Sequence, residues 1–169
     1  MSQHSNPLRL NAGFLVNIPL GESRDFPIEI SHLELDADLI LRDLSGNAQL
    51  TRTANGILAH IWLKASTASQ CVRCLTDFDL PLQVDFTELY AFSTNSTTDS
   101  ELIFPENGYI NLALLVREYM LLDMPISPLC KDDCKGLCPV CGENLNETTC
   151  HHEESTTDPR LSVLKSLLK

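Results

Sequence analysis

The sequence lacks the features that would direct a chain into or across a membrane. No window approaches the roughly 18 uninterrupted apolar residues of a membrane-spanning helix. The first residues, MSQHSNPLRLNAGFLVNI, have no basic start followed by a long apolar core, so they do not form a secretory signal. We therefore expect a cytoplasmic protein without membrane association, in a compartment where cysteine thiols stay reduced.

Basic residues are also scarce. The chain has 12 Lys and Arg against 23 Asp and Glu, and its formal net charge is −11 at pH 7. Non-specific coating of nucleic acid depends on Lys and Arg that neutralise phosphates, so this charge balance excludes it. Any contact with RNA has to be local, driven by shape, or made through a protein partner.

Catalytic motifs are missing as well. The sequence contains no phosphate-binding glycine loop, no G-x-S-x-G and no H-E-x-x-H. The acidic residues are spread along the chain and read mostly as a solvated surface. We therefore expect no enzymatic activity and no small-molecule substrate.

Residues 1–92 show the alternating apolar pattern of β-strands. Apolar residues alternate along two segments, with Ile57, Ala59, Ile61 and Leu63 in one and Leu80, Leu82, Val84 and Phe86 in the other. Asn55 and Gly56 form a strong turn signal. The pair Cys71 and Cys74 falls between the last two strands, at the tip of a hairpin. We predict a curved antiparallel sheet or partial barrel over this range.

The second half of the chain predicts helix and loop. Residues 93–110 are polar and read as a loop, and 111–128 read as a largely apolar, buried helix that begins at Asn111 and ends in the PISP segment. Residues 129–169 form a cysteine-rich tail that closes with a short helix after Asp158 and Pro159. The predicted fold class is therefore α+β, with a zinc-binding tail.

Five of the seven cysteines lie in the segment 130–152, CKDDCKGLCPVCGENLNETTCHH. An odd number of cysteines in a reducing compartment argues against a disulfide framework. A C-x-x-C turn suits Zn²⁺, because two thiolates point at one ion and a following glycine such as Gly142 can take a positive φ. The candidate ligands are Cys71, Cys74, Cys130, Cys134, Cys138, Cys141, Cys150 and His152.

These ligands would fill two tetrahedral sites, so we expect one or two structural zinc ions. The spacing leaves the pairing open. In a compact arrangement Cys138, Cys141, Cys150 and His152 form one site and Cys71, Cys74, Cys130 and Cys134 the other; in a crossed arrangement the two C-x-x-C turns pair as a zinc ribbon. An iron–sulfur cluster would also use four thiolates. So many thiolates favour closed, structural sites over a catalytic metal with an open position.

Four motifs resemble the YceD family, the large ribosomal RNA subunit accumulation proteins. They are CVRCL, INLALLVREYMLLDMPISPLC, CKGLCPVCGENLN and DPRLSVLKSLL, and together they cover roughly residues 70–169 in the order found in the family. Many members carry C-x-C after N-L-N, where this chain has Cys150, His151 and His152. Imidazole can replace thiolate as a zinc ligand.

The resemblance implies a non-enzymatic ribosome-assembly factor that supports accumulation or processing of large-subunit (23S) ribosomal RNA. Its partners would be the precursor RNA, a ribosomal protein or both. Candidate contact residues are the cations Arg73, Lys131, Lys135, Arg160, Lys165 and Lys169. The alternative is a thiol- or metal-responsive regulator that uses Cys71 and Cys74.

Overall fold

The computed structural model describes residues 7–35, 39–92 and 102–150. The elements are β1 (Arg9–Asn11), the 3₁₀ helix η1 (Gly13–Asn17), β2 (Ser23–Leu35), β3 (Leu39–Arg52), β4 (Gly56–Gln70), β5 (Asp77–Ala91), β6 (Tyr109–Asn111) and α1 (Ala113–Asp123). The described chain is thus rich in antiparallel sheet, with one α-helix and a cysteine-rich segment near its C-terminal end.

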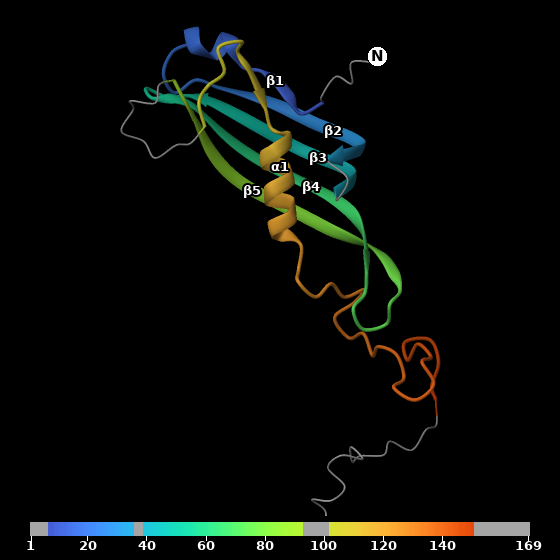
Figure 1. Cartoon of the computed structure of the whole chain (residues 1–169). Helices are drawn as coiled ribbons and strands as arrows, with labels where there is room; N and C mark the ends of the chain where they lie inside the picture. The colour runs from blue at the N-terminus through green and yellow to red at the C-terminus, as the bar shows by residue number, and fades with distance from the viewer. Residues whose placement is uncertain (1–6, 36–38, 93–101, 151–169) are drawn as a thin grey trace, which may run out of the picture.

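Four long strands form a curved sheet in the order β2-β3-β4-β5, all antiparallel (Figure 1). The turn between β3 and β4 closes through a hydrogen bond from Thr53 N to Gly56 O, 2.9 Å long. A Cβ at Gly56 would lie 2.1 Å from the carbonyl oxygen of Tyr90 on β5, so only glycine fits there. The predicted turn at Asn55 and Gly56 is present, but neither residue has a positive φ, so glycine is needed here for the close approach of β5 and not for the turn conformation.

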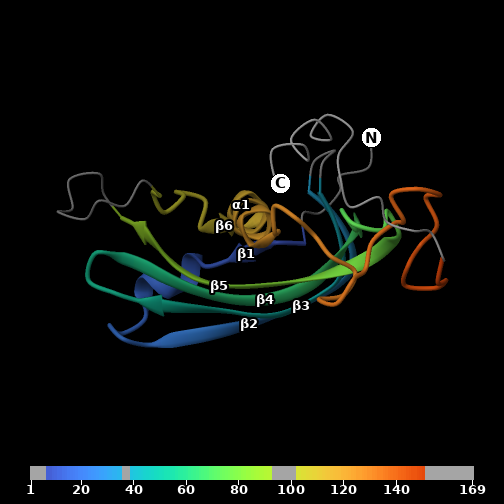
Figure 2. The ribbon, with the colours of Figure 1, turned by 90° about the horizontal axis from the view of Figure 1, so that it is seen from below.

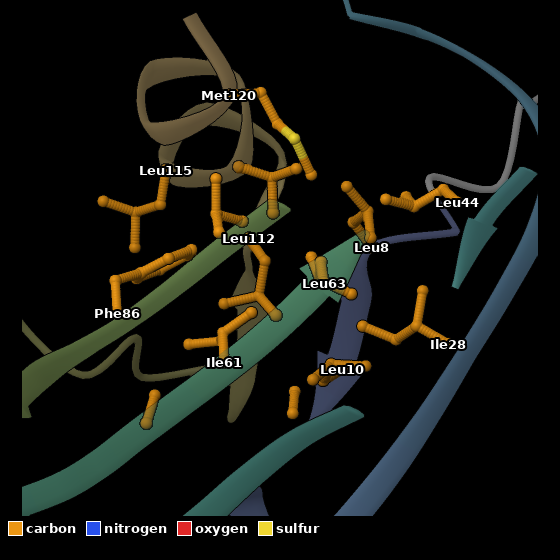
Figure 3. Close-up of a cluster of buried hydrophobic side chains, with 14 of the residues drawn as sticks. Leu8, Leu10, Ile28, Leu44, Ile61, Leu63, Phe86, Leu112, Leu115 and Met120 are labelled. Carbon is orange, nitrogen blue, oxygen red and sulfur yellow. The ribbon is translucent and has the colours of Figure 1, made fainter. Parts of the chain in front are cut away.

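The hydrophobic core lies on one face of this sheet, under α1 and the small β1–β6 sheet (Figure 2). Ile61, Leu63 and Phe86 point from the strands toward Leu112 and the helix (Figure 3). The predicted alternation is confirmed, because every apolar residue assigned to the inner face of β4 and β5 is buried. Burial of these side chains is the main stabilising contribution to the fold.

The helix is shorter than the range 111–128 that the sequence predicts. Met124 is extended at φ −67° and ψ 122°, because the residue before a proline is disfavoured in the α region. At the other end, Asn111 belongs to β6, and its side-chain oxygen accepts a hydrogen bond from Ala113 N, 3.1 Å away. Strand β6 also takes up the end of the predicted loop 93–110. The predicted C-terminal helix lies outside the described residues.

Among the described residues, no helix combines the length and apolar character that crossing a bilayer would require.

Candidate metal centre

The tip of the β4–β5 hairpin is a tight turn built around two cysteines. Leu75 N donates to Cys71 O over 2.9 Å, and Cys71 N donates to Thr76 O over 3.0 Å. These bonds fold the turn so that Cys71 and Cys74 are both buried beneath it. The hairpin thus presents two sulfurs from one turn, as a metal knuckle does.

The chain that follows α1 passes beside this tip and is bonded to it (Figure 1). Val72 N donates to Pro128 O over 3.0 Å, and Leu137 N donates to Arg73 O over 3.1 Å. The Arg73 guanidinium donates to Cys134 O over 2.9 Å. Two segments about 60 residues apart in sequence are therefore held together at the place where four cysteines meet.

The sulfurs of Cys71, Cys74, Cys130 and Cys134 all lie within 4.8 Å of one another. The Cys71–Cys134 distance is 3.7 Å and the Cys74–Cys130 distance is 3.6 Å. A disulfide bond would require about 2.05 Å. In a tetrahedral zinc site with Zn–S bonds of about 2.3 Å, the sulfurs are about 3.8 Å apart. The four thiols therefore have the spacing of ligands to a single tetrahedral ion.

Within the first cluster, the pKa values of Cys71 and Cys130 are shifted in opposite directions. Burial raises the pKa of Cys71, but hydrogen bonds from the backbone of Cys130, Cys74 and Arg73 outweigh it and lower the pKa to about 6. Burial, together with the sulfur of Cys74, raises the pKa of Cys130 to about 12. Four neighbouring thiolates repel one another, so all four can lose their protons only when a cation lies between them.

A second cluster contains Cys138, Cys141 and Cys150, whose sulfurs also lie within 4.8 Å of one another. Its turn repeats the hydrogen bonds of the first knuckle: Gly142 N donates to Cys138 O over 2.9 Å, and Cys138 N donates to Glu143 O over 2.8 Å. The structure thus groups the cysteines as in the compact arrangement and not as in the crossed one. Cys141 is exposed, so this cluster is more open than the first.

The electrostatics of the second cluster resemble those of the first. Backbone N–H groups of Cys141 and Val140 lower the pKa of Cys138 to about 6. The neighbouring sulfur of Cys138 raises the pKa of Cys150 to about 11. Three thiols leave one position of a tetrahedron to another ligand. His152, the residue that the sequence predicts for that position, lies outside the described residues.

Two supporting residues were not predicted from the sequence as part of the site. Asn146 Nδ2 lies 3.4 Å from Cys134 Sγ, and Asn146 Oδ1 accepts a hydrogen bond from Lys135 N over 2.9 Å. Thr76 Oγ1 lies 3.4 Å from Cys74 Sγ. Hydrogen bonds to a ligating sulfur orient it and tune its basicity. The signal for Asn146 was present in the motif CKGLCPVCGENLN, whose last letter it is.

The predicted cationic contact residues differ in their surroundings, and some of them lie outside the described residues. Arg73 directs its guanidinium to the carbonyl of Cys134, and Lys131 lies 3.8 Å from a carboxylate oxygen of Asp133. Lys135 is exposed. Arg160, Lys165 and Lys169 lie outside the described residues.

A family model described as "Large ribosomal RNA subunit accumulation protein YceD" matches residues 59–168. The chain belongs to the YceD family. The matched range takes in most of β4, all of β5 and α1, and every candidate metal ligand. Both cysteine clusters are therefore within the part of the molecule that carries the YceD likeness.

One of three similar curated proteins matches over a longer range than the family model. An uncharacterized protein of Mycobacterium tuberculosis is 33% identical over 138 residues, which cover 79% of this chain and 62% of the relative. The uncharacterized protein YlbN of Bacillus subtilis is 30% identical over 101 residues, covering 59% of each chain. A maize protein named "Large ribosomal RNA subunit accumulation protein YCED homolog 1, chloroplastic" is 36% identical over 76 residues, covering 42% of this chain and 25% of that protein.

The chain thus spans 62% of the length of the first of these relatives. No solved structure matches it.

Proposed function

We propose that this YceD-family chain is a non-enzymatic factor that acts in the cytoplasm and supports the accumulation or processing of 23S ribosomal RNA. The observation that supports the proposal is the family match over residues 59–168, whose description names large ribosomal RNA subunit accumulation. The maize relative carries the same words in its name. The ribosome-related role is the family's; the RNA species and the lack of catalysis are our proposal.

We further propose that structural zinc completes the fold. Four sulfurs within 4.8 Å of one another surround one point, and they leave no open position for a substrate. An iron–sulfur cluster spreads its four thiolates over several irons, which separates them more widely than this. A zinc ion in the first cluster would join the hairpin tip to the tail, and structural zinc contributes directly to folding free energy.

The chemistry of the partner follows from charge. With a net charge of −11, the chain would bind precursor RNA only through a local cationic patch, or would bind a basic ribosomal protein. Lys131 and Lys135 are exposed beside the first cluster and are our candidates for RNA contact in the described chain. The Arg73 guanidinium donates a hydrogen bond to Cys134 O, so we assign Arg73 a structural role in addition to its proposed RNA contact.

A regulatory role for Cys71 and Cys74 has less support. Reactive sensor thiols are accessible to solvent. Cys71 and Cys74 are 0% and 5% exposed, which favours structural ligands over a thiol sensor.

The experiment is deletion of the gene in its host, followed by quantification of 23S RNA and its precursors relative to small-subunit RNA. We expect the mature 23S fraction to fall and to be restored by the wild-type gene. A Cys71→Ser/Cys74→Ser gene should fail to restore it. An unchanged 23S fraction after deletion would refute the proposed function.

A further inference from the structure

The four-stranded sheet has a second face, opposite α1 and β6 (Figure 2). Its side chains alternate along β2, β3, β4 and β5 with those of the core, and apart from Ala91 at the end of β5 none of them is buried. We call this the open face. The opposite side of the sheet is covered by α1. There Tyr119 on α1 donates a hydrogen bond to Glu88 on β5 over 2.7 Å.

Negative charge dominates the open face. Its carboxylates, assigned by strand register and exposure, are Asp25, Glu29, Glu34, Asp77, Asp79 and Asp85. Its permanent cations on these strands are Arg42 and Lys64. Arg42 is paired with Asp79 at 2.9 Å, so it offers little positive charge to a partner.

Trp62, the only tryptophan of the chain, lies at the centre of this face. It is on the inner strand β4, with Asn47 opposite it on β3 and Asp85 opposite it on β5, and it is 37% exposed. Tryptophan is enriched among the residues that dominate binding energy at interfaces, and its ring is the best aromatic partner for a cation. Asp85 is bonded through Oδ1 to His60 Nε2 over 2.7 Å, but its side chain is still 60% exposed. The exposed part of this carboxylate and the indole beside it provide two complementary ways to bind a lysine or arginine side chain.

We propose that the open face binds an extended, lysine- and arginine-rich protein segment, with a cationic side chain over Trp62 and further cations at Asp85, Asp25 and Glu29. RNA is the wrong partner for this face, because its phosphates would be repelled by the carboxylates. The inference rests on the proposed function. Proteins that enter the ribosome carry basic segments that bind RNA phosphates, and the acidic open face would bind such a segment before it contacts the RNA.

The test uses the metal-loaded full chain and a short synthetic peptide of alternating lysine and glycine. The emission of Trp62 reports on this face alone, because the chain has no other tryptophan. We expect the peptide to change that emission and to bind more weakly as salt rises. In the Glu29→Gln/Asp85→Asn double variant, the affinity measured by calorimetry should fall roughly tenfold, since two charge pairs are removed.

The matched control is Glu106→Gln/Glu118→Gln, which removes two exposed carboxylates that do not belong to the open face. Its affinity for the peptide should stay within roughly twofold of wild type, since distant surface charges contribute little. An equal loss in both double variants would overturn the proposal, because it would mean attraction by net charge alone. An unchanged Trp62 emission at saturation, or binding of an RNA oligonucleotide at Trp62, would overturn it as well.

Failure of this inference and failure of the proposed function give different results. If deletion lowers 23S RNA and the Glu29→Gln/Asp85→Asn gene restores it fully, the function stands and the open face is not the partner site. If deletion leaves 23S RNA unchanged, the proposed function fails whatever the peptide does. Thermal unfolding of each variant confirms that the change lies in binding and not in folding.

Discussion

At the residue scale, the two knuckles differ at one informative position. The residue after the second cysteine takes a left-handed conformation in both, at φ 58° for Leu75 and φ 76° for Gly142. Glycine adopts this conformation without steric cost, whereas other L-residues cost roughly 1 kcal/mol there. The side chain of Leu75 is 56% exposed, so it recovers little of that free energy by burial.

We therefore expect Leu75→Gly to raise the free energy of unfolding by about 0.5–1 kcal/mol and Gly142→Ala to lower it by about 1 kcal/mol. Denaturant unfolding of the metal-loaded chain measures both. A Leu75→Gly variant that is less stable than wild type would show that the leucine side chain makes contacts that outweigh its backbone strain.

The fourth ligand of the second cluster can be tested with a pair of adjacent residues. The sequence predicts His152 as that ligand and His151 as a solvated neighbour. His152→Ala should weaken metal binding at the second cluster by roughly 100-fold or more, because a tetrahedral site loses one donor. His151→Ala should leave the affinity unchanged in the same competition assay with a chelating dye. The reverse order of effects would reassign the ligand.

Acid should release the metal. In the metal-free protein the pKa of Cys71 and of Cys138 is about 6, against an ordinary value of 9.0, because backbone N–H groups stabilise their thiolates. A lowered pKa contributes stability that is fully present above about pH 9 and is lost as the pH falls through about 6. We expect metal to be retained at neutral pH and its affinity to fall as the pH drops below about 6, because protons then compete for the same sulfurs. A metal affinity that does not change between about pH 8 and pH 5 would contradict the assignment of Cys71 and Cys138 as ligands, because protons would then not compete for these sulfurs.

At the scale of elements, the sequence predicted what local patterns encode. The alternation along β4 and β5, the turn at Asn55 and the cysteine knuckle at the hairpin tip follow from neighbours close in sequence. The pairing of β1 with β6 could not be predicted, because Leu10 and Ile110 meet across 100 residues and each strand has only three. The irregularity of β3 between Arg42 and Ser45 likewise leaves no local signal.

The burial of α1 on its sheet-facing side can be tested by substitution. Met120 is fully buried against the sheet, whereas Leu122, two residues later, is 80% exposed. Met120→Ala should lower the free energy of unfolding by about 2–5 kcal/mol, because it removes a buried side chain and leaves a cavity. Leu122→Ala should change it by less than about 0.5 kcal/mol. Thermal unfolding of the two variants measures both changes in stability. Equal effects would mean that the outer side of α1 is also covered.

At the scale of the whole molecule, the sequence predicted that the cysteines form metal-binding clusters but left their grouping open. Spacing shows that C-x-x-C turns can bind metal, but it cannot show which distant turns meet. The structure brings Cys71 and Cys74 to Cys130 and Cys134 through main-chain bonds such as Val72 N to Pro128 O. A metal ion there would link the sheet to the tail. Its removal should therefore detach the tail while leaving the large apolar core of the sheet in place.

Native mass spectrometry of the purified full chain, with elemental analysis, tests this arrangement most directly. We expect two zinc ions per chain, one in the Cys134→Ser variant and one in the Cys141→Ser variant, because each substitution removes a ligand from a different cluster. A chain without metal, a mass that corresponds to an iron–sulfur cluster, or loss of both ions from either single variant would contradict two independent structural zinc sites.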